Sequence, residues 1–220
     1  MQKTNTKRNF LITAALFFLA VLYTLALTHV DIGAIAPDGS TVGFSTVNLF
    51  FSELFGYRPL WYDITDFIGI GAVFVAFFFA MLGFYQLMKR KSLLKVDRAL
   101  LFLGGIYLLL IGLYLFFEAV VINTRPVLMG GHAEASYPSS HVMIVVTIFG
   151  SAILTLRRLF PRKKRLLFLF DTTATALIGI TVVGRLLSGV HWFSDIVGGL
   201  LFSAALLMLD FSLLSLVKEV

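Results

Sequence analysis

The chain has 220 residues, of which 59% are hydrophobic and only 14% are charged, and its mean hydropathy is +0.93. These values exclude an ordinary soluble domain, which needs far more polar surface, and no polar stretch is long enough to fold separately. Because cysteine is absent, disulfides and thiolate chemistry are excluded as well. We therefore expect one membrane-embedded domain over residues 1–220.

Six apolar segments are long enough, or nearly so, to cross a bilayer, whose hydrocarbon core requires about 20 helical residues. Three of them are uncharged, and the other three carry between one and three ionisable residues, histidine included. The fourth segment is short, so we expect one of its ends to lie inside the protein. The sequence thus predicts an all-α, polytopic protein with spans at Phe10–Thr28, Phe67–Met88, Ala99–Phe117, His141–Leu156, Leu166–Gly184 and His191–Val217.

The basic residues predict how these helices are oriented. With the N-terminus inside, 15 of the 18 Lys and Arg residues fall in cytoplasmic segments, and only Arg58, Arg125 and Arg185 fall elsewhere. This bias predicts that both termini are cytoplasmic. The net charge of +6 is then explained by topology and anionic lipid, so no nucleic-acid partner is expected. The compact plan favours a multi-pass protein of a bacterial plasma membrane.

The first apolar segment admits two interpretations. Basic residues precede it and Ala34-Ile35-Ala36 follows it, which is the outline of a secretory signal peptide. Its apolar run of 19 residues exceeds the roughly 7–15 of such peptides. We therefore expect the segment to remain as the first membrane helix.

The longest loop follows this segment, and a short helix is predicted within it. Residues 45–56 read STVNLFFSELFG, with Ser45 as the N-cap and Gly56 as the stop. Polar Asn48, Ser52 and Glu53 share one face, opposite a wide apolar face. We expect this outer helix to lie in the membrane interface, as a connector or as a lip that guides a lipid sideways.

Chemically versatile side chains gather on the outer face of this topology. All four histidines fall there, and so do Arg125 and Arg185, in segments that contain histidine. His191 and Asp195 are one helical turn apart, so the carboxylate can orient one ring nitrogen and leave the other free to attack. His141 can protonate a leaving oxygen, and two guanidinium groups suit the oxygens of a phosphate.

Each of these residues also has an ordinary explanation when taken alone. A lone outer arginine contacts headgroups, and a lone interface histidine is incidental. Asp195 differs, because an ionisable group inside an apolar helix costs about 3 kcal/mol at the bilayer centre. Asp171 and Asp210 lie near inner ends, where contact with headgroups or basic loops explains them. A metal site would use the histidines and Asp195 but explains neither arginine, so no metal or other cofactor is expected.

Three short motifs contain most of these side chains: Glu118-x6-Arg125-Pro126, Pro138-Ser139-Ser140-His141 and Gly184-Arg185-x5-His191-x3-Asp195. They resemble the motifs of the type 2 phosphatidic acid phosphatase (PAP2) superfamily of membrane lipid phosphatases. The family patterns are Lys-x6-Arg-Pro, Pro-Ser-Gly-His and Ser-Arg-x5-His-x3-Asp. The third motif, at a helix boundary and with the family spacing, is the specific part of the resemblance.

The resemblance implies a two-step phosphatase reaction that needs no metal. His191 would attack phosphorus to form a phosphohistidine, oriented by Asp195, and His141 would protonate the departing oxygen. Phosphatidic acid, phosphatidylglycerol phosphate or a polyprenyl diphosphate would be hydrolysed at the outer face. The phosphoryl oxygens would be held by Arg125, Arg185, Ser139 and backbone amides near Ser140.

Two other functions use the same residues. A non-enzymatic lipid transporter or scramblase would bind headgroups through the arginines, but this function gives Asp195 no role. A lipid phosphotransferase would pass the phosphoryl group to another lipid and differs only in the acceptor. The sequence selects neither the lipid nor the oligomeric state.

Three positions depart from the family motifs. Ser140 replaces a glycine and Gly184 replaces a serine, while Glu118 puts an anion where the family has a lysine. A carboxylate repels phosphate unless it is paired or protonated. Glu118 therefore either points away and pairs with Arg125 or Arg185, or forms a subsite for a substrate that carries its own cation or hydroxyl.

Overall fold

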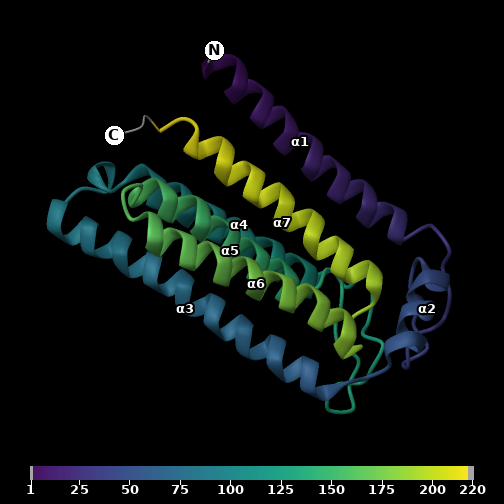
Figure 1. The fold of residues 1–220 in the computed structure, drawn as a ribbon. Helices are drawn as coiled ribbons and strands as arrows, with labels where there is room; N and C mark the ends of the chain where they lie inside the picture. The colour runs from purple at the N-terminus through teal and green to yellow at the C-terminus, as the bar shows by residue number, and fades with distance from the viewer. Residues whose placement is uncertain (1, 218–220) are drawn as a thin grey trace.

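The structure, a computed structural model, describes residues 2–217, with side chains from residue 6 onward. Within these residues there are seven α-helices and no strand, and six of the helices are long and apolar enough to cross a membrane (Figure 1). The predicted all-α class with six spans is confirmed. Of the basic residues used above, Lys218 lies outside the described residues. The helices are α1 Gln2–Leu27, α2 Ser45–Phe55, α3 Pro59–Arg90, α4 Arg98–Ala119, α5 Ser140–Leu159, α6 Lys164–Ser188 and α7 Phe193–Leu214.

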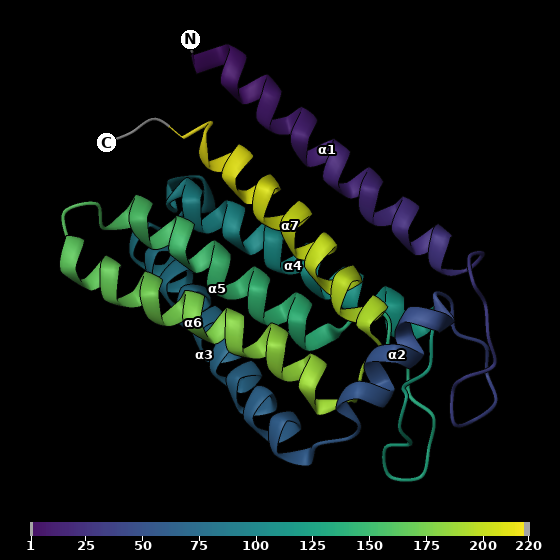
Figure 2. The same cartoon turned by 45° about the vertical axis from the view of Figure 1, so that its right-hand side comes forward.

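Helices α5 and α7 form the centre of the bundle. About half of each lies buried, against 11–28% for the other spans. Helix α1 runs along α7 on one side, and α3 and α6 lie beyond α5 on the other (Figures 1 and 2). Small residues allow the central contact, since a Cβ at Gly150 of α5 would lie 2.7 Å from the Leu207 side chain of α7. The short α5 begins beside buried Ser139, so the prediction that one end lies inside the protein is confirmed.

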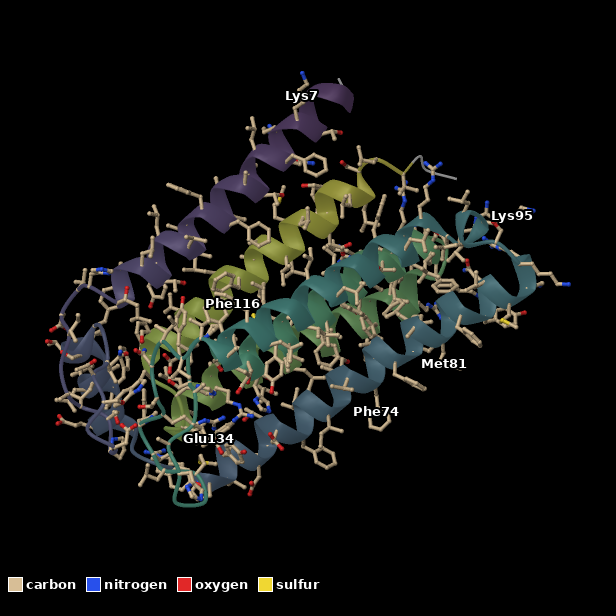
Figure 3. The ribbon with its side chains drawn as sticks, turned by 180° about the vertical axis from the view of Figure 1, so that it is seen from behind. Lys7, Phe74, Met81, Lys95, Phe116 and Glu134 are labelled. Atoms are coloured by element: carbon tan, nitrogen blue, oxygen red, sulfur yellow. The ribbon has the colours of Figure 1, made fainter. Side chains whose placement is uncertain are left out.

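The outside of the bundle is apolar. Phe74 and Met81 project outward from α3 in Figure 3, and they are 68% and 49% exposed. Exposed side chains of this kind recur on α1, α4 and α6, where their contact with water would be costly. This surface fits a lipid environment and accounts for the apolar composition.

The bundle has two different ends. The site end holds residues 28–58, which connect α1 to α3 and include α2, together with the α4–α5 loop of residues 120–139 and the α6–α7 turn. The basic end holds the α3–α4 turn, the α5–α6 loop, the start of α1 and the end of α7 (Figure 1). Figure 3 shows Lys7 and Lys95 at the basic end, far from Glu134 at the site end.

Helix α2 packs on the site end and differs from its prediction in two ways (Figure 2). Its N-cap is Phe44, in a left-handed conformation with φ 49°, so Ser45 as the N-cap is wrong. Asn48 is not on a solvated face but fully buried, where it donates to the Gly43 carbonyl and pairs with Ser194 at 2.9 and 3.0 Å. These bonds fix α2 to the start of α7. Gly56 ends the helix with φ 61°, as predicted.

Two aspartates at the basic end have different surroundings. Asp171 pairs with Arg157 at 2.7 Å, as expected for contact with a basic loop. Asp210 in α7 is fully buried, and neither of its carboxylate oxygens has a hydrogen-bond partner. The explanation by headgroup or basic-loop contact is therefore wrong for Asp210.

Candidate active site

The three hairpin ends that carry the motifs meet at the site end, as the sequence predicts. Arg125 lies in the α4–α5 loop, His141 in the first turn of α5 and Arg185 in the last turn of α6. His191 lies in the turn before α7, and Asp195 lies in the first turn of α7. The charge of Arg185 acts on both histidine rings and that of Arg125 acts on His191, so these residues form one cluster.

The His191 ring is held by a backbone carbonyl. Its Nδ1 lies 3.1 Å from the Ser136 carbonyl oxygen, and a carbonyl only accepts, so Nδ1 carries the proton. Nε2 is then the unprotonated nitrogen, and it is buried without any hydrogen-bond partner. The ring thus presents a free lone pair on Nε2, the form that a nucleophile requires.

Asp195 is placed as predicted, but it does not hydrogen-bond to His191. Its Oδ2 lies 3.8 Å from Nδ1, which is too long for a hydrogen bond. Instead, Oδ2 accepts from the Trp192 backbone N–H at 2.9 Å and Oδ1 accepts from Asn123 Nδ2 at 3.1 Å. The first of these bonds belongs to a capping box, because α7 begins at Phe193 and not at His191. Asp195 therefore fixes the start of α7 and places a negative charge near the ring.

The surroundings of His191 keep its ring neutral. Burial lowers the pKa of His191 below its ordinary value of 6.5, since a buried imidazolium loses its hydration. The carboxylate of Asp195 opposes this shift, while the nearby charges of Arg125 and Arg185 reinforce it. A ring that stays neutral below pH 6.5 remains competent for attack in mildly acidic conditions.

Both arginines keep unused donors in buried positions. Arg125 forms an ion pair with Glu134, at 3.3 Å between Nε and Oε2. The Arg185 side chain is fully buried, stacks on the Tyr62 ring at 4.9 Å and reaches Asp66 with Nη2 at 3.4 Å. Nη1 of Arg125, and both Nε and Nη1 of Arg185, have no hydrogen-bond partner. Buried donors are rarely left unbonded, so these groups mark a place for an acceptor-rich ligand.

The Pro-Ser-Ser-His segment lies against α7 with little space between them. A Cβ at Gly198 would lie 2.3 Å from the Tyr137 ring, and one at Gly199 would lie 3.0 Å from the Ser139 carbonyl oxygen. This close contact lets the Ser139 N–H donate to the Asp195 carbonyl at 2.9 Å, so that amide is not free. The Ser139 hydroxyl is buried and unbonded, and Ser140 opens α5, where the first N–H groups lack helical partners.

Several site residues were not predicted from the sequence. Asp66 of α3 lies 2.8 Å from His141 Nε2, and Asn123 and the Ser136 carbonyl hold Asp195 and His191. Helix α3 begins at Pro59, eight residues before the predicted start, because proline suits the first helical position. Asp66 therefore lies inside the helix. Its position directly before a long uncharged run was the available signal.

Glu118 lies at the end of α4 and is exposed. It borders a cavity of about 10 Å³ together with Ser140 and His191, so it lies beside the site. In the described residues it forms no ion pair, and Arg125 pairs with Glu134 instead. Of the two alternatives for Glu118, pairing with Arg125 or Arg185 is therefore wrong, and the subsite alternative stays a prediction. No group of three His, Cys, Asp or Glu side chains suited to a metal ion occurs in residues 2–217.

Comparison with known proteins supports the resemblance found in the motifs. Residues 116–216 match the family model of the PAP2 superfamily. The solved structure of a transmembrane PAP2 type phosphatidylglycerolphosphate phosphatase from Bacillus subtilis has a similar fold, with a TM-score of 0.57. It is 19% identical, and the match covers 91% of this chain and 93% of that chain. None of the curated proteins matches.

Proposed function

We propose that this PAP2-superfamily chain is a lipid phosphatase that hydrolyses a lipid phosphate or diphosphate through a phosphohistidine. The observation that carries the proposal is the set of buried, unpartnered polar atoms at the site end. They are Nε2 of His191, the Ser139 hydroxyl, Nη1 of Arg125, and Nε and Nη1 of Arg185. A nucleophilic lone pair beside cationic and hydroxyl donors is the arrangement that phosphoryl transfer requires.

The first step begins at His191. Nε2 attacks phosphorus and a P–N bond forms, while the P–O bond to the lipid breaks and its electron pair stays on the departing oxygen. His141 donates a proton to that oxygen, so the lipid alcohol, or the lipid monophosphate from a diphosphate, leaves neutralised. The Nδ1–H bond to the Ser136 carbonyl stabilises the ring as it becomes positive.

The second step reverses these roles. A water gives its proton to His141 and attacks phosphorus, the P–N bond breaks, and inorganic phosphate leaves. Throughout, Arg125 and Arg185 offset the charge on the phosphoryl oxygens, and Ser139 can donate one hydrogen bond. The chain's own residues thus account for attack, protonation and charge stabilisation.

A lipid substrate is supported by an apolar groove beside the site. This groove has a volume of about 920 Å³ and is bounded by α3, α4 and α5. It extends from Leu93 and Val96 near the basic end to Tyr114, which also borders the small cavity beside His191. A hydrocarbon chain in the groove would keep its apolar surroundings while its phosphate reached His191.

The proposal places the site end on the extracytoplasmic face of a plasma membrane, because the basic end holds most of the Lys and Arg residues. It also treats residues 1–220 as one domain. Support for this comes from α1 and α3, which precede the matched segment but pack on α7 and on α5 and α6.

Release of inorganic phosphate tests the proposal. Purified protein in detergent with EDTA would receive phosphatidic acid, phosphatidylglycerol phosphate or undecaprenyl diphosphate. We expect chelator-resistant release that His191→Ala abolishes. His132→Ala is the matched control, because His132 is an exposed histidine of the α4–α5 loop. Lipid binding without release would instead support a transporter, and transfer of the label to a second lipid would support a phosphotransferase.

A further inference from the structure

Asp66 belongs to α3, outside the segment that carries the three motifs, yet its carboxylate contacts two residues of the site. Oδ1 lies 2.8 Å from Nε2 of His141 and 3.4 Å from Nη2 of Arg185. We propose that Asp66 is a positioning residue that holds His141 as the general acid of the reaction. This inference rests on the proposed phosphatase function.

The contact decides which nitrogen of His141 faces the reaction. Because Nε2 donates to Asp66, the remaining nitrogen is Nδ1, which is buried and has no partner. A general acid must carry a proton on the nitrogen that faces the leaving oxygen, so the ring acts as an imidazolium protonated on both nitrogens. The carboxylate of Asp66 accepts the second of these protons and fixes the plane of the ring.

The charges around His141 explain why a carboxylate is needed there. The ring faces Asp66 from α3, Arg185 from α6 and His191 from the turn before α7. Of these three groups, only Asp66 is an anion. Arg185 opposes a second positive charge nearby, and Asp66 offsets that effect while bonding to both groups.

Two glycines bring α3 close enough for this contact. A Cβ at Gly69, one turn after Asp66, would lie 3.1 Å from Cδ2 of His141. A Cβ at Gly184 of α6 would lie 2.5 Å from Cγ2 of Thr65 and 3.1 Å from the Trp61 ring. Gly184 stands where the family motif has serine, so its lack of a side chain is what admits α3 here. Glycine at position 184 therefore allows α3 to approach closely enough for Asp66 to reach His141.

A narrower role for Asp66, as counter-ion of Arg185 alone, makes a different prediction. Arg185 holds the phosphoryl group whatever the leaving group is, whereas the general acid matters only when the leaving oxygen is strongly basic. An alkyl phosphate needs protonation of its leaving oxygen, and an aryl phosphate does not. The dependence on the leaving group therefore separates the two roles.

The experiment measures kcat and KM of Asp66→Asn with a lipid alkyl phosphate and with p-nitrophenyl phosphate. Asparagine keeps the shape and can still accept from Nε2, but it removes the charge. We expect kcat/KM for the lipid, which reports only the steps up to departure of the leaving group, to fall by about 10²-fold, within the range of general acid catalysis. The kcat/KM of the aryl phosphate should lose little, even where the later hydrolysis of the phosphohistidine slows. His141→Ala should show the same split, and the double variant should be no slower than His141→Ala.

The matched control is Asp63→Asn, an exposed aspartate three residues earlier in the same helix, which should leave both substrates unaffected. Asp66→Glu keeps the carboxylate and should recover part of the lipid activity, which serves as the second measurement if Asp66→Asn folds poorly. Equal losses on both substrates, a change in KM alone, or multiplying losses in the double variant would overturn the inference. Failure of the wild type to release phosphate from either substrate would overturn the proposed function instead.

Discussion

Each end of the bundle holds an Arg–Asp ion pair, but the arginine is exposed at one end and buried at the other. At the basic end, Arg157 is 60% exposed and pairs with Asp171, so water remains around the guanidinium. At the site end, Arg185 is fully buried, pairs with Asp66 at a longer distance and leaves two nitrogens unbonded. Burying an ion is costly, whereas exposed pairs cost and contribute little. The site end therefore differs from the basic end in burying an arginine whose donors are not all bonded, and not merely in carrying charge.

The largest difference between the ends should appear when each arginine is removed. Arg185→Met should lower phosphate release by about 10³-fold, the order of loss for a transition-state arginine in phosphoryl transfer. The fold should persist, because the partner Asp66 is 43% exposed and can be hydrated. Release assays and thermal unfolding in detergent measure both effects.

Arg157→Met is the matched change at the basic end. It should leave release unchanged and alter the free energy of unfolding by less than about 1 kcal/mol, because an exposed ion pair contributes little. Equal losses of activity in the two variants would remove the distinction between the ends.

The close approach of α3 to the site can be broken by restoring the family residue. Gly184→Ser places a Cβ 2.5 Å from Cγ2 of Thr65, a clash that should cost about 1–3 kcal/mol and displace Asp66. Adding Thr65→Ser removes the clashing methyl but keeps the hydroxyl that donates to the Trp61 carbonyl at 2.8 Å. We expect the double variant to recover stability and activity. A stable, fully active Gly184→Ser single variant would show that α3 is not constrained there.

The apolar groove between α3, α4 and α5 can be filled by a substitution that lies away from the site. Gly104 lines the groove and has open space around a Cβ, so Gly104→Phe should occupy it. KM for a long-chain lipid phosphate should rise about tenfold, since displacing roughly two methylene groups costs about 1.6 kcal/mol. KM for p-nitrophenyl phosphate should not change. Gly112→Phe, on the same helix but outside the groove lining, is the control.

The smallest predicted effect is on the pH dependence of activity, which reports the protonation of the His191 ring. Because burial lowers the pKa of His191, the nucleophile should stay unprotonated as the pH falls through 6.5 and lose activity only below it. The profile of kcat/KM against pH, measured with an aryl phosphate of low second pKa, reports this limb. A limb centred at or above pH 6.5 would indicate a solvated His191.

The membrane spans, which depend on the length of apolar runs, were predicted well from the sequence. Long apolar runs gave the six spans, and the motif spacing from Arg185 through His191 to Asp195 belongs to residues that the fold brings to one end of the bundle. Both signals are strong because a bilayer imposes a fixed helix length and because motif spacing constrains which side chains can meet.

The remaining features depend on contacts that leave little trace in the sequence. The carbonyl of Ser136 holds His191, and a backbone oxygen has no residue signature. Asp66 stood at the edge of an apolar run, where a charged residue is normally a helix boundary, and only the start at Pro59 places it inside α3. Asp195 was predicted to orient His191 directly, but its carboxylate accepts from the Trp192 amide and lies 3.8 Å from the His191 ring nitrogen.

The most direct test of the central claim is to trap the covalent intermediate. Protein mixed with radiolabelled lipid phosphate and quenched in base should carry a base-stable, acid-labile phosphate on the peptide that contains His191. The label should be absent from His191→Ala. It should accumulate in His141→Ala supplied with labelled aryl phosphate, because that first step needs no acid while the second lacks its base. Steady turnover by wild-type protein with no covalent label at any quench time would contradict the account and indicate direct attack by water.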